Sequence, residues 1–469
     1  MNIKDQVVPR SMLMPFILIT SCFALWGFAN DITNPMVEAF SRIFSMGASG
    51  GTWVQVVFYG GYGAMAFPAA LFIRKYTYKS GILVGLGLYA LGCLLFIPAS
   101  SIGLYPPFLI AYFIMTCGLS FLETSANPYV LSMGPDSTAT RRLNLAQAFN
   151  PIGSLTGMFV ATTMIQANLD PRGAAERATL LPEQFEAVKS HDLHVLSNPY
   201  ISIGLVIIAM FVIIAIAKMP NKEESDHRLN LWGTLKKLFK IPKYREGVIT
   251  QMFYVGAQIM CWTFIVQYGQ RIFVRDGLTP QDLESGWLHI VDSLGFLSSD
   301  VSKVISSGQG VNGLSLGAGA HIAQLYNILA MFFFLVARFV CTFMLKYIQP
   351  GRLLQYLAIG GIILASGTIF IDGMNGLYCL IGVSACMSLM FPTIYGIALE
   401  GMGDDAKFGA AGLIMAIVGG TVLPKSQAWI IDLKQIGSMP AVNVSFILPL
   451  ICFVIITIYG YRTVKRQAL

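Results

Sequence analysis

The chain has 469 residues, of which 55% are hydrophobic and 12% are charged, and its formal net charge is +7. Its mean hydropathy is +0.65. Ordinary soluble domains carry roughly 25% charged residues, so a water-soluble fold could not bury this much apolar surface. The composition excludes a soluble protein and indicates one that lies mostly within a lipid bilayer.

Twelve apolar segments come close to the roughly 20 residues that an α-helix needs to cross a bilayer. The predicted spans of the first half are residues 12–40, 52–73, 80–98, 106–130, 144–168 and 199–217. Those of the second half are residues 246–270, 322–346, 353–371, 376–399, 408–431 and 443–462. A membrane barrel would need short alternating segments instead. The predicted fold class is therefore an all-α membrane protein with twelve transmembrane helices.

The positive charge does not indicate nucleic acid, because Lys and Arg are spread through short loops and form no stripe interleaved with aromatic residues. The positive-inside rule explains them better. If the N-terminus is cytoplasmic, most of the 31 Lys and Arg lie inside. The expected location is a bacterial inner membrane, with both termini in the cytoplasm.

The most charged stretch, residues 218–245, lies midway along the chain. It predicts a cytoplasmic linker between an N-terminal six-helix bundle, residues 1–217, and a C-terminal six-helix bundle, residues 246–469. A weak internal repeat supports two related halves: Asn127–Pro128 and Phe391–Pro392 occupy equivalent positions and each precedes a Met-Gly turn. Many transporters share this plan and bind substrate between the halves.

Polar residues first gather in the segment WGFANDITNP of the first span. Asn30, Asp31 and Asn34 lie on neighbouring turns, and a carboxylate among amides can hold a proton or a sodium ion. Ionisable groups within a span are costly and by default functional. We predict cation coupling at Asp31 and Asn34, with a candidate sodium site at Asp31 and a sugar contact at Asn30. The alternative is that Asp31 lies in water near the outer mouth.

Glu123 lies in the middle of the fourth span, in GLSFLETSANPY. Burial in a low dielectric favours the neutral carboxyl group and so suits it to proton exchange. We predict that Glu123 couples the cation and contacts the solute, together with the nearby Asn127. The alternative is a structural hydrogen bond between helices.

Amides and aromatic rings recur at helical spacing in the fifth and seventh spans. Sugar hydroxyls need donors and acceptors together, and the C–H faces of a sugar pack on aromatic rings. The alternative is that these side chains only join helices. The complete predicted sugar site is Asn30, Glu123, Asn127, Gln147, Asn150, Tyr254, Gln258 and Trp262.

Two further charges fall within spans, Arg338 in the eighth and Lys425 in the eleventh. Each either pairs with a carboxylate during transport or lies near water. The eight cysteines lie in or beside apolar segments and lack the Cys-x-x-Cys or Cys/His spacing of a metal site. We therefore predict no cofactor and no metal apart from the candidate sodium ion.

Taken together, these motifs resemble the fucose/galactose/glucose cation symporter family of the major facilitator superfamily. The matching stretches include FALWGFAND, LETSANPYV, GPDSTATRRLNLAQAFNPIG, YVGAQIMCW and FPTIYGIALEGMGDDAKFG. The resemblance covers nearly the whole chain. It implies a monomer whose two bundles rock about a central sugar site, and a proton exchanged by an aspartate of the first helix and a glutamate of the fourth.

The glutamate of that family pattern corresponds to Glu123, whereas the aspartate does not correspond to Asp31. The pattern has Asn at the place of Asp31 and Asp at the place of Asn34. The carboxylate of this chain is therefore displaced by one helical turn, about 5 Å. For this reason the coupling ion is either a proton or sodium. Lys425 replaces an apolar residue of the family, which leaves the identity of the sugar open.

The predicted function is a cation-coupled sugar symporter that acts by alternating access on a monosaccharide such as fucose, glucose or galactose, with membrane lipid around it. No GxxxxGK[ST] motif indicates an ATP-driven pump, and no HExxH or GxSxG motif indicates an enzyme. The alternatives are a transporter-like sugar sensor and a carrier of another small polar solute.

Overall fold

The computed structural model describes residues 7–33, 36–46, 48–51, 53–165, 168–170, 172, 177, 179–220, 231–276, 287–293, 316–402 and 405–467. Within these residues the regular structure is helical apart from one short hairpin, in which β1 (Gln435–Ile436) pairs antiparallel with β2 (Met439–Pro440). Eleven of the described helical segments are long and apolar enough to cross a membrane.

The first described helices are η2 (Arg10–Met12), α1 (Leu13–Thr33), α2 (Met36–Ile43), α3 (Ala48–Gly51), α4 (Trp53–Lys75), α5 (Tyr78–Leu94), α6 (Phe96–Ile102) and α7 (Tyr105–Ser132). They are followed by η3 (Asp136–Thr138), α8 (Ala139–Gln147), α9 (Asn150–Val160), the π-turn η4 (Ala161–Ile165) and α11 (Pro182–Ile216).

The later helices are α12 (Leu231–Lys240), α13 (Pro242–Asp276), α15 (Trp287–Ser293), α17 (Leu316–Met344), α18 (Pro350–Phe370), α19 (Met374–Met387) and α20 (Met390–Leu399). The last ones are α21 (Ala406–Met415), η7 (Ala416–Val418), α22 (Gly419–Asp432), α23 (Ala441–Ser445) and α24 (Ile447–Gln467).

Each of the eleven apolar helical segments overlaps one predicted span, whereas the fifth predicted span is divided. Within residues 144–168, α8 ends at Gln147 and α9 begins at Asn150. Pro151, at the start of α9, lacks the N–H that a continuous helix would use. A π-turn then follows at Ala161–Ile165.

The chain divides into two compact units. Unit 1 comprises Met1–Met252 and Pro392–Thr421, and unit 2 comprises Phe253–Phe391 and Val422–Leu469. The boundaries between the units fall within α13, α20 and α22. The division into residues 1–217, a linker at 218–245 and residues 246–469 stays a prediction.

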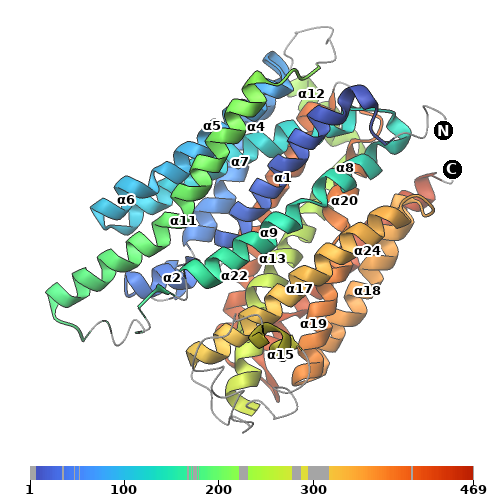
Figure 1. Cartoon of the computed structure of the whole chain (residues 1–469). Helices are drawn as coiled ribbons and strands as arrows, with labels where there is room; N and C mark the ends of the chain where they lie inside the picture. Colours follow the sequence, from blue (N-terminus) through green and yellow to red (C-terminus); the bar gives the residue numbers. More distant parts are fainter. Residues whose placement is uncertain are drawn as a thin grey trace. The chain divides into compact units, whose positions relative to one another are not determined.

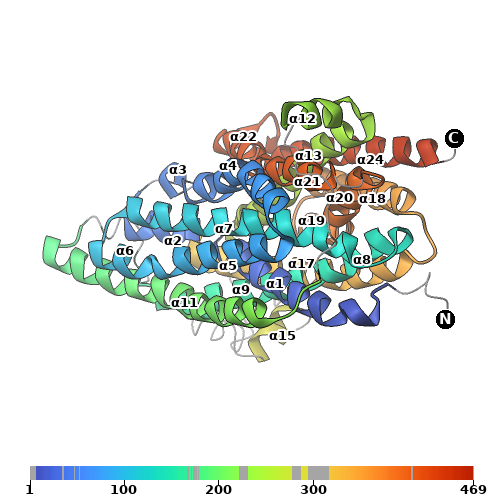
Figure 2. The same cartoon turned by 90° about the horizontal axis from the view of Figure 1, so that it is seen from above.

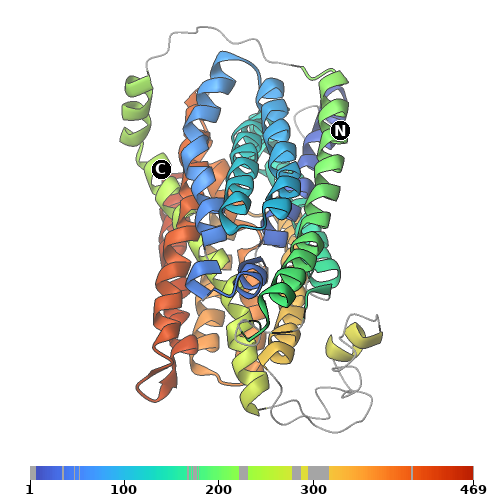
Figure 3. The same ribbon diagram turned by 90° about the vertical axis from the view of Figure 1, so that its left-hand side faces the viewer.

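In unit 1, α5 lies between α7 and α11 (Figure 2). The long green helix α11 extends well beyond the predicted span 199–217, because it begins at Pro182 (Figure 3). At the contact of α11 with its neighbours, the Phe96 ring stacks on the Tyr200 ring with centroids 4.2 Å apart. The Tyr112 hydroxyl donates to the Tyr200 hydroxyl at 2.7 Å. Buried aromatic rings thus fix these helices side by side.

Helix α1, which carries Asn30 and Asp31, packs along α9 (Figure 1). Two glycines make this approach close. A methyl group on Gly27 would overlap the backbone carbonyl of Asn150, and one on Gly153 would overlap the carbonyl of Ala24. Small residues that let two backbones meet are typical of helix contacts in membranes.

We expect Gly153→Ala to destabilise the protein, because overpacking a close contact costs about 1–3 kcal/mol. A lower midpoint of thermal unfolding in detergent would show this. Gly60→Ala is the matched control, since a methyl group there meets no atom within 4 Å. Equal unfolding midpoints for the two variants would contradict the close contact between α1 and α9.

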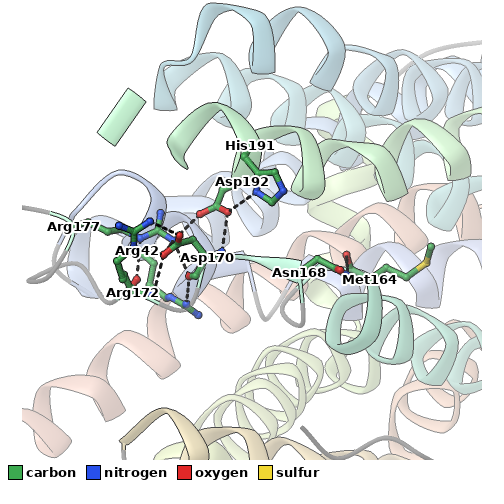
Figure 4. A network of polar contacts seen from close by, with 8 residues as sticks. All are labelled: Arg42, Met164, Asn168, Asp170, Arg172, Arg177, His191 and Asp192. Atoms are coloured by element: carbon green, nitrogen blue, oxygen red, sulfur yellow. Dashed lines mark hydrogen bonds and ion pairs between the residues drawn. The ribbon is translucent and has the colours of Figure 1, made fainter. Parts of the chain in front are cut away.

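A polar network joins the end of α2 to the segment before α11 and to α11 itself (Figure 4). Arg177 donates to Asp192 at 2.6 Å, and both side chains are at most 1% exposed. The backbone carbonyl of Asp170 accepts hydrogen bonds from Arg42 at 2.7 Å and from Arg177 at 2.9 Å. The hydrogen bond from Arg172 holds the pKa of the Asp170 carboxyl group well below its usual range.

Asp192→Ala is expected to destabilise the protein by about 3–5 kcal/mol, because it removes the nearer carboxylate of the buried Arg177 and leaves only Asp170, at 4.0 Å. The measurement is again thermal unfolding in detergent. Glu186→Ala, on the same helix, removes a carboxylate that is 64% exposed and pairs with Lys189, and it should leave the midpoint unchanged. The double variant Arg177→Met/Asp192→Leu should recover most of the loss. A midpoint for Asp192→Ala equal to that of wild type would refute the structural role of the pair.

In unit 2, α18 packs against α19 and α24, and α17 packs against α19. Arg271, near the end of α13, donates to the side chain of Asn443 at 2.6 Å and to that of Asp372 at 3.2 Å. These contacts tie the end of α13 to α23 and to the segment between α18 and α19. The helix that carries Tyr254, Gln258 and Trp262 is therefore held at this end by polar contacts.

Candidate functional site

Glu123 lies in the middle of α7 and is 2% exposed. The hydroxyl of Tyr62 on α4 and the indole of Trp26 on α1 lie close enough to interact with its carboxyl group. Its Oε2 atom has no hydrogen-bond partner among the described residues. Protonation of a buried carboxylate removes the free-energy cost of burying the charge. Glu123 is therefore placed where it can take up a proton without breaking a hydrogen bond at Oε2.

Asp31 lies near the end of α1 and is only 4% exposed. Contact with water, the alternative interpretation, is limited to this small fraction. Tyr59 of α4 lies close enough to Asp31 to interact with its charge. Asn30, the preceding residue, accepts a hydrogen bond from the Tyr62 hydroxyl at 3.5 Å. Asn34, the other predicted cation ligand, lies outside the described residues.

One face of α4 supplies site residues that the sequence analysis missed. Tyr59 and Tyr62 lie three residues apart, with Gln55 one turn before them, and all three side chains are buried. This spacing in VQVVFYGGYG was a readable signal, because residues three and four apart share a helical face. The spacing alone does not show that this face of α4 lies against the carboxylates Asp31 and Glu123.

We name the set formed by these side chains of α1, α4 and α7 the carboxylate cluster. It is built from neutral donors around two buried acids. Its members are Trp26, Asn30, Asp31, Tyr59, Tyr62 and Glu123.

The amides of α7, α8 and α9 make contacts within unit 1. Gln147 donates to Asn127 Oδ1 at 2.7 Å, while Asn127 Nδ2 has no partner in the part of the chain that the structure describes. Asn150 donates to the Phe23 carbonyl of α1 at 3.2 Å. Asn150 therefore joins α9 to α1 in this structure, whereas Asn127 keeps a buried donor available.

In unit 2, Tyr254 and Trp262 direct their polar atoms at neighbouring helices. The Tyr254 hydroxyl donates to the Met387 carbonyl at 3.1 Å, and the Trp262 indole donates to Ser384 Oγ at 3.2 Å. Asn327 of α17 donates to the Trp262 carbonyl at 3.1 Å. Gln258 lies between the two aromatic residues on the same face and is half-buried. Ser384 and Asn327 were not predicted, because a single polar residue in an apolar span gives no pattern.

The two other charges of the spans have different surroundings. Arg338 is 3% exposed, and its guanidinium lies over the Phe334 ring, 4.8 Å from the centroid. The Phe334 ring meets the Trp262 ring edge-on at 5.1 Å. Lys425, in contrast, is exposed on α22. The structure thus brings Arg338, and not Lys425, to the aromatic group around Trp262.

The predicted site residues fall into two groups. Unit 1 holds the members Asn30, Asp31, Glu123, Asn127, Gln147 and Asn150, and unit 2 holds Tyr254, Gln258, Trp262, Arg338 and Lys425. Within unit 1, α1, α4 and α7 bring the two carboxylates into one cluster of polar and aromatic side chains.

Comparison with known proteins identifies the family to which the chain belongs. The model described as Major Facilitator Superfamily matches residues 19–424. The chain belongs to this superfamily. The major facilitator fold has twelve helices, which confirms the predicted fold class.

Relatives match along almost their whole length. The L-fucose-proton symporter of Haemophilus influenzae is 48% identical over 99% of both chains. That of Escherichia coli is 29% identical over 97% of this chain and 94% of the relative. The glucose/galactose transporter of Brucella abortus is 30% identical over 94% and 92%.

Solved structures of two transporters resemble the fold of this chain. The major facilitator transporter FucP, in the outward conformation, is 28% identical and has a TM-score of 0.78, with 97% of this chain and 99% of that one covered. The xylose symporter XylE has a TM-score of 0.57 at 11% identity, over 95% of this chain and 94% of that one. This second likeness shows the fold alone.

Proposed function

We propose that this protein is a sugar–proton symporter of a bacterial inner membrane that carries a monosaccharide, with L-fucose as the first candidate, together with a proton. The observation that carries the proposal is Glu123, a buried carboxyl group with donors on one side and an unpartnered Oε2 atom. The relatives support the same conclusion, since two of them are L-fucose-proton symporters that match nearly the whole chain.

In this proposal a proton binds to Glu123 and the sugar binds to the predicted amides and aromatic rings. Each ligand favours the other, because coupling between two binding sites is reciprocal. Joint occupancy then permits the change between outward-open and inward-open forms. The proposal includes a monomer in membrane lipid with both termini in the cytoplasm, and no cofactor beyond the coupling ion.

The coupling ion has a second candidate. The buried Asp31 carboxylate, beside the Asn30 amide, offers the oxygen atoms that a sodium ion prefers. Its displacement by three residues from the family position leaves both the proton and sodium as candidates at this residue. Sodium coupling and proton coupling differ in which gradient drives uptake.

The test is counterflow uptake of a radiolabelled sugar panel into proteoliposomes that contain the purified protein. We expect exchange of L-fucose or of a closely related monosaccharide. An imposed pH gradient should then drive accumulation without sodium. Exchange of no sugar in the panel would refute the sugar carrier and leave the sensor or another polar solute. Accumulation only with a sodium gradient would replace the proton by sodium.

A further inference from the structure

The Tyr62 hydroxyl stands between two acceptors that belong to different helices. It donates to Asn30 Oδ1 of α1 at 3.5 Å. It also lies close enough to the Glu123 carboxyl group on α7 to interact with it. Tyr62 is 1% exposed, so water does not compete for its hydroxyl. A phenol has one proton to donate, so Tyr62 can serve one of these acceptors fully at a time.

We propose that Tyr62 is a positioning residue that passes the protonation state of Glu123 to the amide of Asn30. This inference rests on the proposed function and deepens it, because it names the link between the proton site and a sugar-binding side chain. Tyr62 itself neither carries the proton nor touches the sugar.

The direction of the link follows from hydrogen-bond strength. A bond to an ionised carboxylate is roughly twice as strong as a bond between neutral groups. When Glu123 is ionised, the Tyr62 hydroxyl therefore points at the carboxylate and leaves Asn30 weakly held. When a proton binds to Glu123, the carboxylate becomes a neutral acid, its attraction for the hydroxyl falls, and the hydroxyl turns to Asn30 Oδ1.

The amide of Asn30 then has a fixed orientation. With its oxygen held by Tyr62, the Asn30 NH₂ group is directed away from Tyr62 and can donate to a sugar hydroxyl. Asn30 is only partly buried, which leaves room for such a contact. Proton binding thus organises Asn30 before the sugar arrives, and the affinity for sugar rises as the pH falls.

Two acids lie near this pair of side chains. Asp31, next to Asn30, interacts with Tyr59, whereas Glu123 interacts with Tyr62 itself. The other titratable groups around the pair, Tyr59, Tyr89 and Tyr395 of α20, do not ionise in the working pH range. Trp26, which also lies near Glu123, does not titrate. The charge of Glu123 therefore acts directly on the Tyr62 hydroxyl.

The test is Tyr62→Phe, which removes the hydroxyl and keeps the ring that meets Phe58 edge-on. We measure the half-saturation concentration for sugar exchange by counterflow between about pH 5 and about pH 8. In wild type it should rise by about fivefold or more with pH, as coupling between sites typically allows. In Tyr62→Phe it should change by less than about twofold over the same pH range.

Tyr112→Phe is the matched control, because it removes an equally buried hydroxyl of unit 1 that donates to Tyr200. It should keep the pH dependence of wild type. Asn30→Ala removes the acceptor and should flatten the pH profile as Tyr62→Phe does. The double variant Tyr62→Phe/Asn30→Ala should add nothing further to this flattening, as is expected of residues that act as one unit.

A wild-type pH dependence in Tyr62→Phe would overturn the inference even if the protein transports sugar. If Tyr62→Phe does not fold, Asn30→Ala decides alone, and a retained pH dependence in that variant overturns it. Failure of wild type to exchange any sugar would instead refute the proposed function. The two failures are therefore distinguishable.

Discussion

Glu123→Gln is expected to abolish the accumulation of sugar against its concentration gradient. The ratio of internal to external sugar under an imposed pH gradient should fall to about 1, because a carrier without a coupled ion only equilibrates its solute. Gln keeps the size and the acceptor oxygen that Tyr62 and Trp26 contact, but it cannot bind the coupling proton. Sugar exchange at equal concentrations should therefore continue.

The matched control is Glu400→Gln, which neutralises a glutamate that is 58% exposed and pairs with Lys243. It should accumulate sugar as wild type does. Accumulation by Glu123→Gln to the wild-type ratio would show that Glu123 is a structural acid, which is the alternative considered for it.

Asp31→Asn is expected to have an effect of similar size. Asp31 is the second buried acid of the carboxylate cluster, so its loss should also bring the accumulation ratio to about 1. The double variant Asp31→Asn/Asn34→Asp moves the carboxylate three residues along the chain and should restore part of the accumulation. Both variants are measured with imposed pH and sodium gradients in proteoliposomes.

Full accumulation by Asp31→Asn under the same pH gradient would remove Asp31 from the coupling machinery. Stimulation of wild type by sodium, lost in Asp31→Asn, would instead identify Asp31 as a sodium site. The behaviour of Asp31→Asn thus shows which of the two candidate ions drives sugar uptake.

Most of the fold could be predicted from hydropathy, because a bilayer fixes the length of the apolar helix that crosses it. The fifth span shows the limit of that signal. Hydropathy runs continuously through residues 144–168, whereas Pro151 divides the helix there and a π-turn follows. Backbone hydrogen bonding, which hydropathy does not report, sets this boundary.

The acids of the candidate site could be predicted because charge within a span is costly. The side chains that contact these acids could not be predicted. Tyr59 and Tyr62 share a helical face in the sequence, but only the packing of α4 shows that this face meets Asp31 and Glu123. The contact between Arg177 and Asp192 could not be predicted either, since it depends on tertiary packing and not on a sequence pattern.

Sugar-dependent proton movement tests the proposed symport most directly. Proteoliposomes or whole cells that contain the protein are suspended in a lightly buffered medium, and the external pH is recorded as each sugar is added without any imposed gradient. We predict that a transported sugar such as L-fucose raises the external pH in wild type and not in Glu123→Gln. A wild-type protein that takes up the sugar with no change in external pH would contradict proton symport.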